Sequence, residues 1–220
     1  MQTISYVAFD ADDTLWANED LFVAAQAQYV AMLAKYTEQR NLAYFGYGIK
    51  GFTLSMIETA IQITHGTITG HEIGQIIELA RAMVYAPLEL LPHVAEVIPA
   101  LAQHYKLMLI TKGDLFDQEA KIARSGLADY FTHIDVVSDK TPAAYARLLR
   151  RYDINPQSFV MVGNSLRSDV LPILAIGARA IHVPYHLTWQ HEHVDVPIAD
   201  RQWIELPDLH AVRDWFAQTA

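Results

Sequence analysis

The sequence predicts an α/β protein, in which helices cover a parallel sheet and an all-helical segment is inserted after the first strand. Short apolar runs recur along the 220 residues, and the last four are separated by helical patterns of β-α-β length. The first run ends at Phe9 and the second begins only at Leu107, so the gap is far longer than one crossover needs. We therefore expect one core domain with an insertion.

Five apolar runs are the expected strands. Their residues are apolar at successive positions rather than at alternate ones, which is typical of strands covered on both faces. The spacing of the last four predicts right-handed crossovers. The runs lie at residues 6–9, 107–110, 134–137, 159–162 and 180–183.

The long gap after the first run contains several helical patterns. We expect Asn18 to cap a helix that has Glu19 and Asp20 in its first turn. Further patterns run from about Phe52 to Ile63 and from about His71 to Tyr85. The apolar residues at helical spacing in the first of these helices are Leu21, Ala25, Tyr29, Met32, Leu33 and Tyr36.

These patterns set the predicted domain boundaries. We assign residues 16–88 to the helical insertion, and residues 1–15 together with 89–220 to the core domain. A fourth helical pattern leads into the second strand, and Pro99 within it predicts a kink or a later start.

The core helices carry their own boundary signals. Gly126 and Gly177 stand near the ends of two helices, where a left-handed residue is favoured, and Pro142 suits a first helical position. Residues 203–220 are expected to form a final helix that covers the core. Its apolar face would consist of Leu209, Val212, Trp215 and Phe216.

Composition and charge exclude several classes of protein. Hydrophobic residues make up 52% of the chain and charged residues 19%, which excludes a disordered chain. The net charge of −9 disfavours nucleic acid or an anionic membrane as the main partner. The chain has no cysteine, no signal-peptide pattern and no long apolar stretch. We therefore expect a cytoplasmic protein; its oligomeric state cannot be predicted from the sequence.

Polar residues follow four of the five expected strands. Ligands of open parallel sheets bind beyond the carboxyl ends of the strands, so these residues are expected to converge on one edge. They are Asp10-Ala11-Asp12-Asp13-Thr14, Thr111-Lys112-Gly113-Asp114, Ser138-Asp139-Lys140, and Gly163-Asn164-Ser165 with Asp169 beyond it.

This set of residues suits phosphoryl transfer. One carboxylate can attack phosphorus while a second protonates the leaving alkoxide and later activates water. Asp10 and Asp12 are two apart, so in an extended chain their side chains face the same side. Oxygen ligands from Asp10, Asp169 and a backbone carbonyl suit Mg²⁺, and Lys140 would offset further negative charge. The Thr111 hydroxyl can hydrogen-bond a phosphate oxygen.

The same residues, in this order, resemble the four motifs of the haloacid dehalogenase (HAD) superfamily. Residues 9–15 (FDADDTL) resemble motif I, residues 110–113 (ITKG) motif II, Lys140 motif III, and the stretch from Gly163 to Asp169 motif IV. The helical insertion between motifs I and II resembles the type-1 cap of this family. The resemblance implies a Rossmannoid parallel sheet core with an inserted all-α cap.

The resemblance also implies an activity and a role for each residue. It implies a Mg²⁺-dependent phosphatase that acts on a small phosphorylated metabolite, with Asp10 as nucleophile and Asp12 as general acid and base. The expected phosphate-binding residues are Thr111, Lys112 and Lys140. The expected metal ligands are Asp10, Asp12 through its carbonyl oxygen, Asn164 and Asp169.

Several alternatives stay open on this reading. Dehalogenases and phosphonatases of the family typically lack an acid at the position of Asp12, so Asp12 favours phosphomonoester chemistry. A phosphomutase keeps the same pair of acids. Outside the enzymes, the alternatives are a phospho-acceptor domain and a non-catalytic phosphate-binding protein. The second is suggested by Asn164, because motif IV usually begins with an acid.

Other polar features are assigned more modest roles. Residues 46–51 match G-x-G-x-x-G but follow a helix rather than a strand, so we do not expect a dinucleotide site. Within this segment and just after it, Tyr47, Lys50 and Thr53 are candidates to face the active site. We expect Asp13 to cap the next segment, and Asp114 and Asp139 to be helix-start acids. The loop with His186, His191, Glu192 and His193, preceded by His182, is read as a polar loop, in which Trp189 packs under the cap or closes the core.

Overall fold

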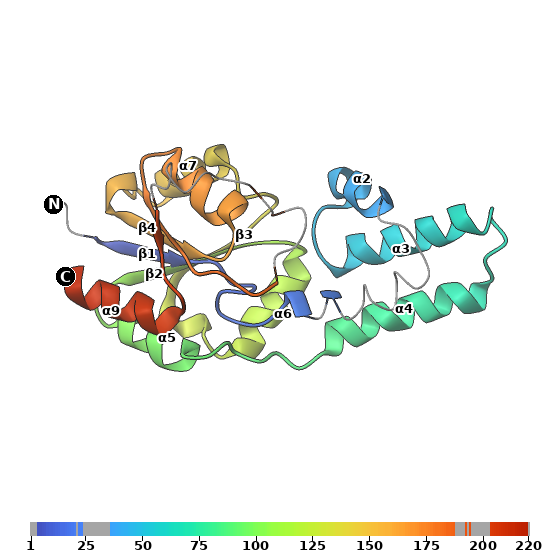
Figure 1. The fold of residues 1–220 in the computed structure, drawn as a ribbon, viewed down its shortest axis with the longest axis horizontal. Helices are drawn as coiled ribbons and strands as arrows, with labels where there is room; N and C mark the ends of the chain where they lie inside the picture. Colours follow the sequence, from blue (N-terminus) through green and yellow to red (C-terminus); the bar gives the residue numbers. More distant parts are fainter. Residues whose placement is uncertain are drawn as a thin grey trace.

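The core is a six-stranded sheet in which every paired strand is parallel and the spatial order is β3-β2-β1-β4-β5-β6. The computed structural model describes residues 4–20, 22–23, 36–187, 192, 194 and 203–219. Figure 1 shows the sheet between two layers of helices, with α2, α3 and α4 beyond one end of it and both termini at the other end. The predicted α/β class with a parallel sheet is therefore confirmed.

Each expected strand forms, and most extend by a few residues. β1 spans Tyr6–Phe9 as predicted, and the later strands are β2 (Lys106–Lys112), β3 (Phe131–Val137), β4 (Phe159–Gly163) and β5 (Arg179–His182). The sequence did not predict β6 (Ile204–Glu205), a two-residue strand that pairs with β5. The strand order reverses at β1, which pairs with both β2 and β4, and ligands of such sheets bind at this switch point.

Both faces of the sheet are buried, which explains the continuous apolar runs. On one face Val7 and Phe9 of β1 pack with Leu107 and Leu109 against α5, α6 and α9. On the other face Ala8, Met108 and Ile110 pack against α7 and the segment that follows β4. Successive residues of these strands therefore enter two different cores.

Helices α5 to α9 form the two layers that cover the sheet. Their bounds are Val94–Ala102 (α5), Leu115–Ser125 (α6), Pro142–Arg151 (α7), Leu171–Leu174 (α8) and Leu209–Thr219 (α9). Three short helical turns connect these elements: η1 (Ala128–Tyr130), η2 (Pro156–Ser158) and η3 (Leu166–Val170).

The boundary signals of these helices act largely as expected. Gly126 and Gly177 are left-handed, and Pro142 occupies the first turn of α7 after its N-cap. The later start that Pro99 could have imposed on α5 is not observed, because Pro99 lies inside the helix. Residues 203–208 precede α9, so the expected helix over 203–220 begins later than its first residue.

The helical insertion has a small core of its own. It contains α2 (Tyr36–Phe45), α3 (Ile49–Ile63) and α4 (Gly70–Tyr85), and the last two match their predicted ranges closely. α2 was not predicted as a separate helix. Residues 19–20 and 22–23 are helical after Asn18, as expected, and the rest of the range expected to be helical lies outside the described residues. The buried apolar residues of this core are Ile49, Phe52, Met56, Ala60, Ile76, Ala80 and Met83.

The segment that contains these helices agrees with an inserted all-α cap, and the boundaries 16–88 stay a prediction. In the described part of the chain, no helix combines the length and the apolar character that a membrane crossing requires.

Candidate active site

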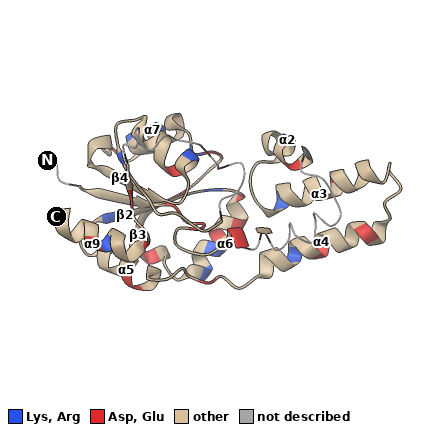
Figure 2. Cartoon of the chain, in the orientation of Figure 1, with Lys and Arg blue, Asp and Glu red and all other residues tan. Residues whose placement is uncertain are grey.

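A cavity partly open to solvent lies where the carboxyl end of the sheet meets the helical insertion. Its wall includes residues of the loop after β1 and of α2, α3 and α6. Figure 2 shows acidic and basic residues gathered around α6, at this junction. All seven residues that the sequence predicted for the site line this one cavity: Asp10, Asp12, Thr111, Lys112, Lys140, Asn164 and Asp169.

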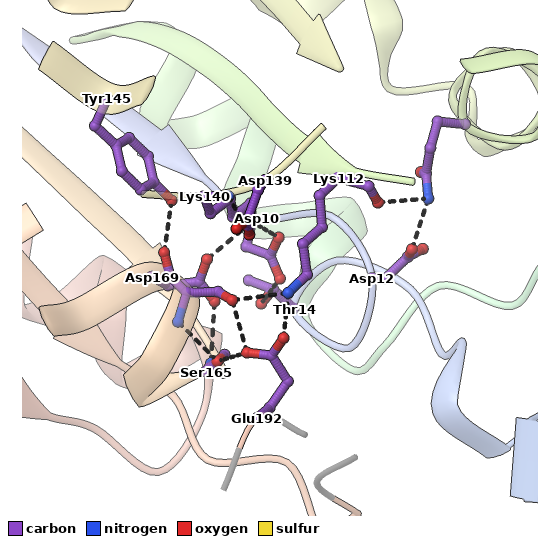
Figure 3. Close-up of polar contacts among 12 residues, drawn as sticks. Asp10, Asp12, Thr14, Lys112, Asp139, Lys140, Tyr145, Ser165, Asp169 and Glu192 are labelled. Atoms are coloured by element: carbon purple, nitrogen blue, oxygen red, sulfur yellow. Dashed lines mark hydrogen bonds and ion pairs between the residues drawn. The ribbon is translucent and has the colours of Figure 1, made fainter. Parts of the chain in front are cut away.

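Asp10, Lys140 and Asp169 form a buried charged cluster at the centre of the sheet edge (Figure 3). The Asp10 amide donates to the carbonyl of Val162 at 2.8 Å, which extends the pairing of β1 with β4 by one residue. The Lys140 ammonium donates to both carboxylates, and its distance to Asp169 is 2.8 Å. Thr14 Oγ1 donates to the other Asp10 oxygen at 3.2 Å. One lysine thus bridges two carboxylates that come from distant parts of the chain.

Burial controls the ionisation of this cluster. Burial and the adjacent Asp169 charge raise the pKa of Asp10 above its usual value, while the charge of Lys140 opposes the rise. Burial alone would lower the pKa of Lys140, but the charges of Asp10 and Asp169 raise it well above its usual value. The site therefore holds a permanent cation next to an excess of carboxylate.

Asp12 lines the cavity but its carboxylate has different partners from that of Asp10. Trp16 Nε1 donates to it at 2.6 Å and Gln118 Nε2 donates to it at 2.8 Å. Lys121 Nζ lies 3.7 Å away. The argument from an extended chain fails here, because β1 ends at Phe9 and a turn follows. Figure 3 shows the two carboxylates well apart.

Lys112 and Glu192 form an ion pair on the wall of the cavity. Glu192 also accepts hydrogen bonds from Ser165 and Ser168. Burial opposes the ionisation of Glu192, but the charge of Lys112 and these hydrogen bonds lower its pKa. Lys112 lies 4.3 Å from the centre of the Tyr47 ring. Lys112 therefore reaches the predicted site, but with its charge already paired.

The segment after β4 positions Asp169. Ser165 caps a π-helical turn at Leu166–Val170, and Asp169 Oδ2 accepts from the Ser165 amide at 3.0 Å. Gly163 is required at the end of β4, because a Cβ there would stand 2.4 Å from the Asp169 side chain. Asn164 follows, and its carbonyl oxygen lies 3.0 Å from His182 Nε2.

The oxygen atoms in this part of the cavity suit a hard divalent cation. Asp10 and Asp169 supply two carboxylates that share one lysine, and Asn164 adds an amide oxygen to the same wall. Burial and the charge of Asp169 raise the pKa of Asp10, and such a cation would neutralise this carboxylate charge. Among the described residues, no three His, Asp or Glu side chains form a ready metal cluster, since the Asp12 carboxylate faces Trp16 and Gln118.

Asp13 has the capping role expected of it. Its Oδ1 accepts from the amides of Asn18 and Glu19, both at 2.9 Å, at the start of the first helix of the insertion. Burial raises the pKa of Asp13 to about 7, although these two hydrogen bonds oppose the rise. Asp114 is the N-cap of α6, as expected, but Thr141 rather than Asp139 caps α7.

The remaining sequence features divide between the cavity and other parts of the fold. Residues 46–48 join α2 to α3 and residues 49–51 form the start of α3, so the segment follows a helix rather than a strand and does not match a dinucleotide site. Tyr47 lines the cavity as anticipated. Lys50 instead pairs with Asp114 outside it, and Thr53 bonds the carbonyl of Ile49.

The histidine loop is only partly described. His182 contacts Glu205 and the carbonyl of Asn164, which ties β5 to β6 and to the loop after β4. His186 lies 3.3 Å from Asp20. The expectations for Trp189, His191 and His193 lie outside the described residues, whereas Glu192 lies in the cavity.

Three groups in the site were missed by sequence reasoning. They are Gln118 and Lys121, one turn apart on the cavity side of α6, and the Trp16 indole. Gln118 and Lys121 flank no motif, and only their contact with Asp12 identifies them. Trp16 lies four residues after Asp12, a spacing that suits a turn contact.

Comparison with known proteins places these features in a family. A family model described as haloacid dehalogenase-like hydrolase matches residues 4–177. A solved haloacid dehalogenase-like family hydrolase from Xanthomonas campestris is 42% identical, with a TM-score of 0.85 over 100% of this chain and 99% of that one. A solved 2-haloacid dehalogenase from Pseudomonas syringae has a TM-score of 0.67 over 99% of this chain and 100% of that one. At 23% identity it supports the fold alone.

Curated relatives match part of the chain. A glyceraldehyde 3-phosphate phosphatase of Pyrococcus furiosus is 27% identical over 110 residues, which cover 48% of this chain and 46% of the relative. The protein of the same name from Methanothermobacter thermautotrophicus is 28% identical over 145 residues, which cover 63% of this chain and 60% of the relative. The matches thus span about half of each relative's length.

Proposed function

The chain belongs to the haloacid dehalogenase-like hydrolase family, and from this premise we propose that it is a Mg²⁺-dependent phosphatase of small phosphomonoesters. The observation that carries the proposal is the placement of Asp10. Its carboxylate lies at the switch point of the sheet, next to the Lys140 ammonium, in a cavity that also contains Asp12.

In the first step, an oxygen of Asp10 attacks the phosphorus atom of the ester. The bond between phosphorus and the alcohol oxygen breaks, and protonated Asp12 gives its proton to the departing alkoxide. The alcohol leaves and the phosphoryl group remains on Asp10 as an acyl phosphate. Lys140 and the Thr111 hydroxyl stabilise the phosphate oxygens, because both line the cavity next to Asp10.

In the second step, Asp12 takes a proton from a water molecule as the water oxygen attacks phosphorus. The bond between phosphorus and Asp10 breaks, which releases inorganic phosphate and restores both acids. Trp16 and Gln118 each donate a hydrogen bond to the carboxylate of Asp12, which fixes its position in the cavity.

A bound Mg²⁺ supplies charge neutralisation for the anionic nucleophile and the anionic substrate. Asp10, Asp169, Asn164 and the carbonyl oxygen of Asp12 are the groups that would hold it. An amide at position 164 supplies one negative charge fewer than the acid usual in this motif, so we expect weak metal binding.

The lining of the cavity is shared between the core and the helical insertion. Lining residues from α2 and α3 stand across from the phosphate-binding groups, where the alcohol part of the substrate would lie. The partial relatives are named for glyceraldehyde 3-phosphate, which makes a short phosphorylated compound the appropriate first class to screen.

Hydrolysis of p-nitrophenyl phosphate tests the proposal. We expect release that requires Mg²⁺, stops in EDTA and is lost in Asp10→Asn, while Asp129→Asn, an exposed control, retains it. Release of many phosphate molecules per enzyme molecule would exclude a phospho-acceptor domain and a protein that only binds phosphate. Normal turnover by Asp10→Asn would contradict the assignment of the nucleophile.

A further inference from the structure

The part of the cavity formed by the helical insertion contains two carboxylates that the proposed reaction does not use. Glu19 lies at the start of the first helix of the insertion, and Glu38 lies in the first turn of α2. Both are only partly exposed. Within the described part of the chain, neither carboxylate accepts a hydrogen bond or pairs with a cation.

The two carboxylates lie within electrostatic range of each other. Burial raises the pKa of Glu19 to about 8, and the charges of Asp13, Asp12 and Glu38 add to the rise. Burial also raises the pKa of Glu38. Among the described residues, no cation compensates these two carboxylates.

A third acceptor without a partner lies on the core side of the cavity. Gln118 is 3% exposed, and its Nε2 is committed to Asp12. Its Oε1 is buried and has no hydrogen-bond partner among the described residues. A buried acceptor without a donor is costly, and a bound molecule that supplies a donor would remove that cost.

The charged residues that line the whole cavity are also mostly acidic. Its described lining contains eight Asp and Glu residues but three Lys residues, with no Arg or His. A phosphate dianion and a divalent metal ion would cancel each other's charge and leave this excess in place. The three lysines are already paired, Lys112 with Glu192, Lys121 with Asp117 and Lys140 with Asp10.

We propose that the substrate carries a primary ammonium group on its alcohol part, which Glu19, Glu38 and Gln118 Oε1 bind. An ammonium group offers three N–H donors and one positive charge, which matches three unused acceptors in an acidic surrounding. This inference rests on the proposed phosphatase function and specifies its substrate class.

The aromatic residues nearby limit the rest of the substrate. Phe22 and Phe52 line the same part of the cavity and pack edge to face, with ring centres 6.0 Å apart. They add apolar surface to a lining that also contains the carboxylates and the phosphate-binding groups, so a short carbon chain is the expected linker. Aromatic faces also attract an ammonium group directly.

The test compares three phosphomonoesters at saturating Mg²⁺. O-phosphoethanolamine has the ammonium group, propyl phosphate replaces that group with a methyl group, and phosphocholine keeps the charge but has no N–H. A positive charge near the ester makes its alcohol a better leaving group, and phosphocholine controls for this effect because it carries the same charge. We expect kcat/KM for O-phosphoethanolamine to exceed that for each of the others by at least about tenfold.

Isosteric variants assign this preference to the cavity. Glu19→Gln and Glu38→Gln should each reduce the ratio of kcat/KM between O-phosphoethanolamine and propyl phosphate by about tenfold. Glu78→Gln, an exposed change on α4 beside Arg81, should leave that ratio within about twofold.

The outcomes separate the two proposals. Equal kcat/KM for all three esters, or a ratio of kcat/KM that is unchanged in both variants, would overturn the ammonium proposal. The proposed phosphatase function would still stand if the enzyme hydrolyses p-nitrophenyl phosphate. Equal turnover of phosphocholine and O-phosphoethanolamine would overturn the role of Gln118 Oε1 and the N–H donors. Failure to hydrolyse any ester, p-nitrophenyl phosphate included, would contradict the phosphatase itself.

Discussion

Lys140→Met tests how the fold supports two buried carboxylates at the end of the sheet. The Lys140 side chain is 2% exposed and bridges Asp10, 9% exposed, and Asp169, 1% exposed. Methionine keeps most of the volume but removes the cation. Two buried carboxylates would then face each other without a counter-charge, and removing one partner of such a pair typically costs about 3–5 kcal/mol.

Thermal unfolding in EDTA at neutral pH measures this loss. For a chain of this length, about 3–5 kcal/mol corresponds to a fall in Tm of roughly 6–20 °C. Lys50→Met is the matched control, because Lys50 pairs with Asp114 at 2.9 Å but is 65% exposed, so its loss should cost at most about 1 kcal/mol. A Lys140→Met protein as stable as the wild type would refute the reasoning.

The pH dependence of the loss gives a second readout. Removing Lys140 raises the pKa of Asp10 in the folded state further above its value of 3.8 in the unfolded chain. Stability is then lost as pH rises from that value through the folded pKa, because the unfolded state releases the proton first. The pKa of Asp10 is already about 8 with Lys140 present, so the two proteins diverge as pH rises above that value, and the deficit of Lys140→Met should be larger at pH 9 than at pH 7. A deficit that grew on acidification would contradict this account.

Three further predictions concern the same edge of the sheet. Gly163→Ala should destabilise the fold by about 1–3 kcal/mol by displacing Asp169, whereas Gly74→Ala, in open space within α4, should stabilise it slightly in the same denaturant titration. Asn164→Asp should lower the Mg²⁺ concentration for half-maximal activity; an unchanged value would mean that residue 164 is not a ligand. The pKa of Asp13 is about 7 in the folded protein, so its ionisation should lower the free energy of unfolding as pH rises from about 4 to 7. In Asp13→Asn the free energy of unfolding should fall less over this pH range. An equal fall in the variant and the wild type would contradict this prediction.

The sheet was predictable because its signals are local. β1, β2, β4 and β5 each pack residues into two cores, which requires apolar residues at successive positions. Helix boundaries at Gly126, Gly177 and Pro142 depend on the residue itself, since a left-handed backbone or a fixed φ is a property of that residue. β6, at two residues, is too short to show a pattern.

The predicted site residues converged because the topology requires it. Residues that follow the carboxyl ends of parallel strands meet at one edge, whatever their separation in the chain. The relation between Asp10 and Asp12 could not be predicted, because the alternation of side chains holds only while the strand continues. The strand stops at Phe9, and the tight turn that follows gives Asp13 a φ of 58°.

The partners of Asp12 and Lys112 depended on packing that no motif encodes. Gln118 and Lys121 reach Asp12 because α6 forms part of the cavity wall, and Glu192 reaches Lys112 from 80 positions away in the chain. A single glutamine or glutamate has no sequence signature. Only its neighbours in the fold distinguish it from a solvent-exposed residue.

Trapping the phosphorylated enzyme tests the central claim most directly. Asp12→Asn removes the base that activates water, so with p-nitrophenyl phosphate and Mg²⁺ the phosphoryl group should accumulate on Asp10. Reduction with borohydride converts an aspartyl phosphate to homoserine, which mass spectrometry of the peptide containing residue 10 would locate. We predict homoserine at position 10 and none in Asp10→Asn/Asp12→Asn. Modification at another residue, or turnover with residue 10 unmodified, would contradict the account.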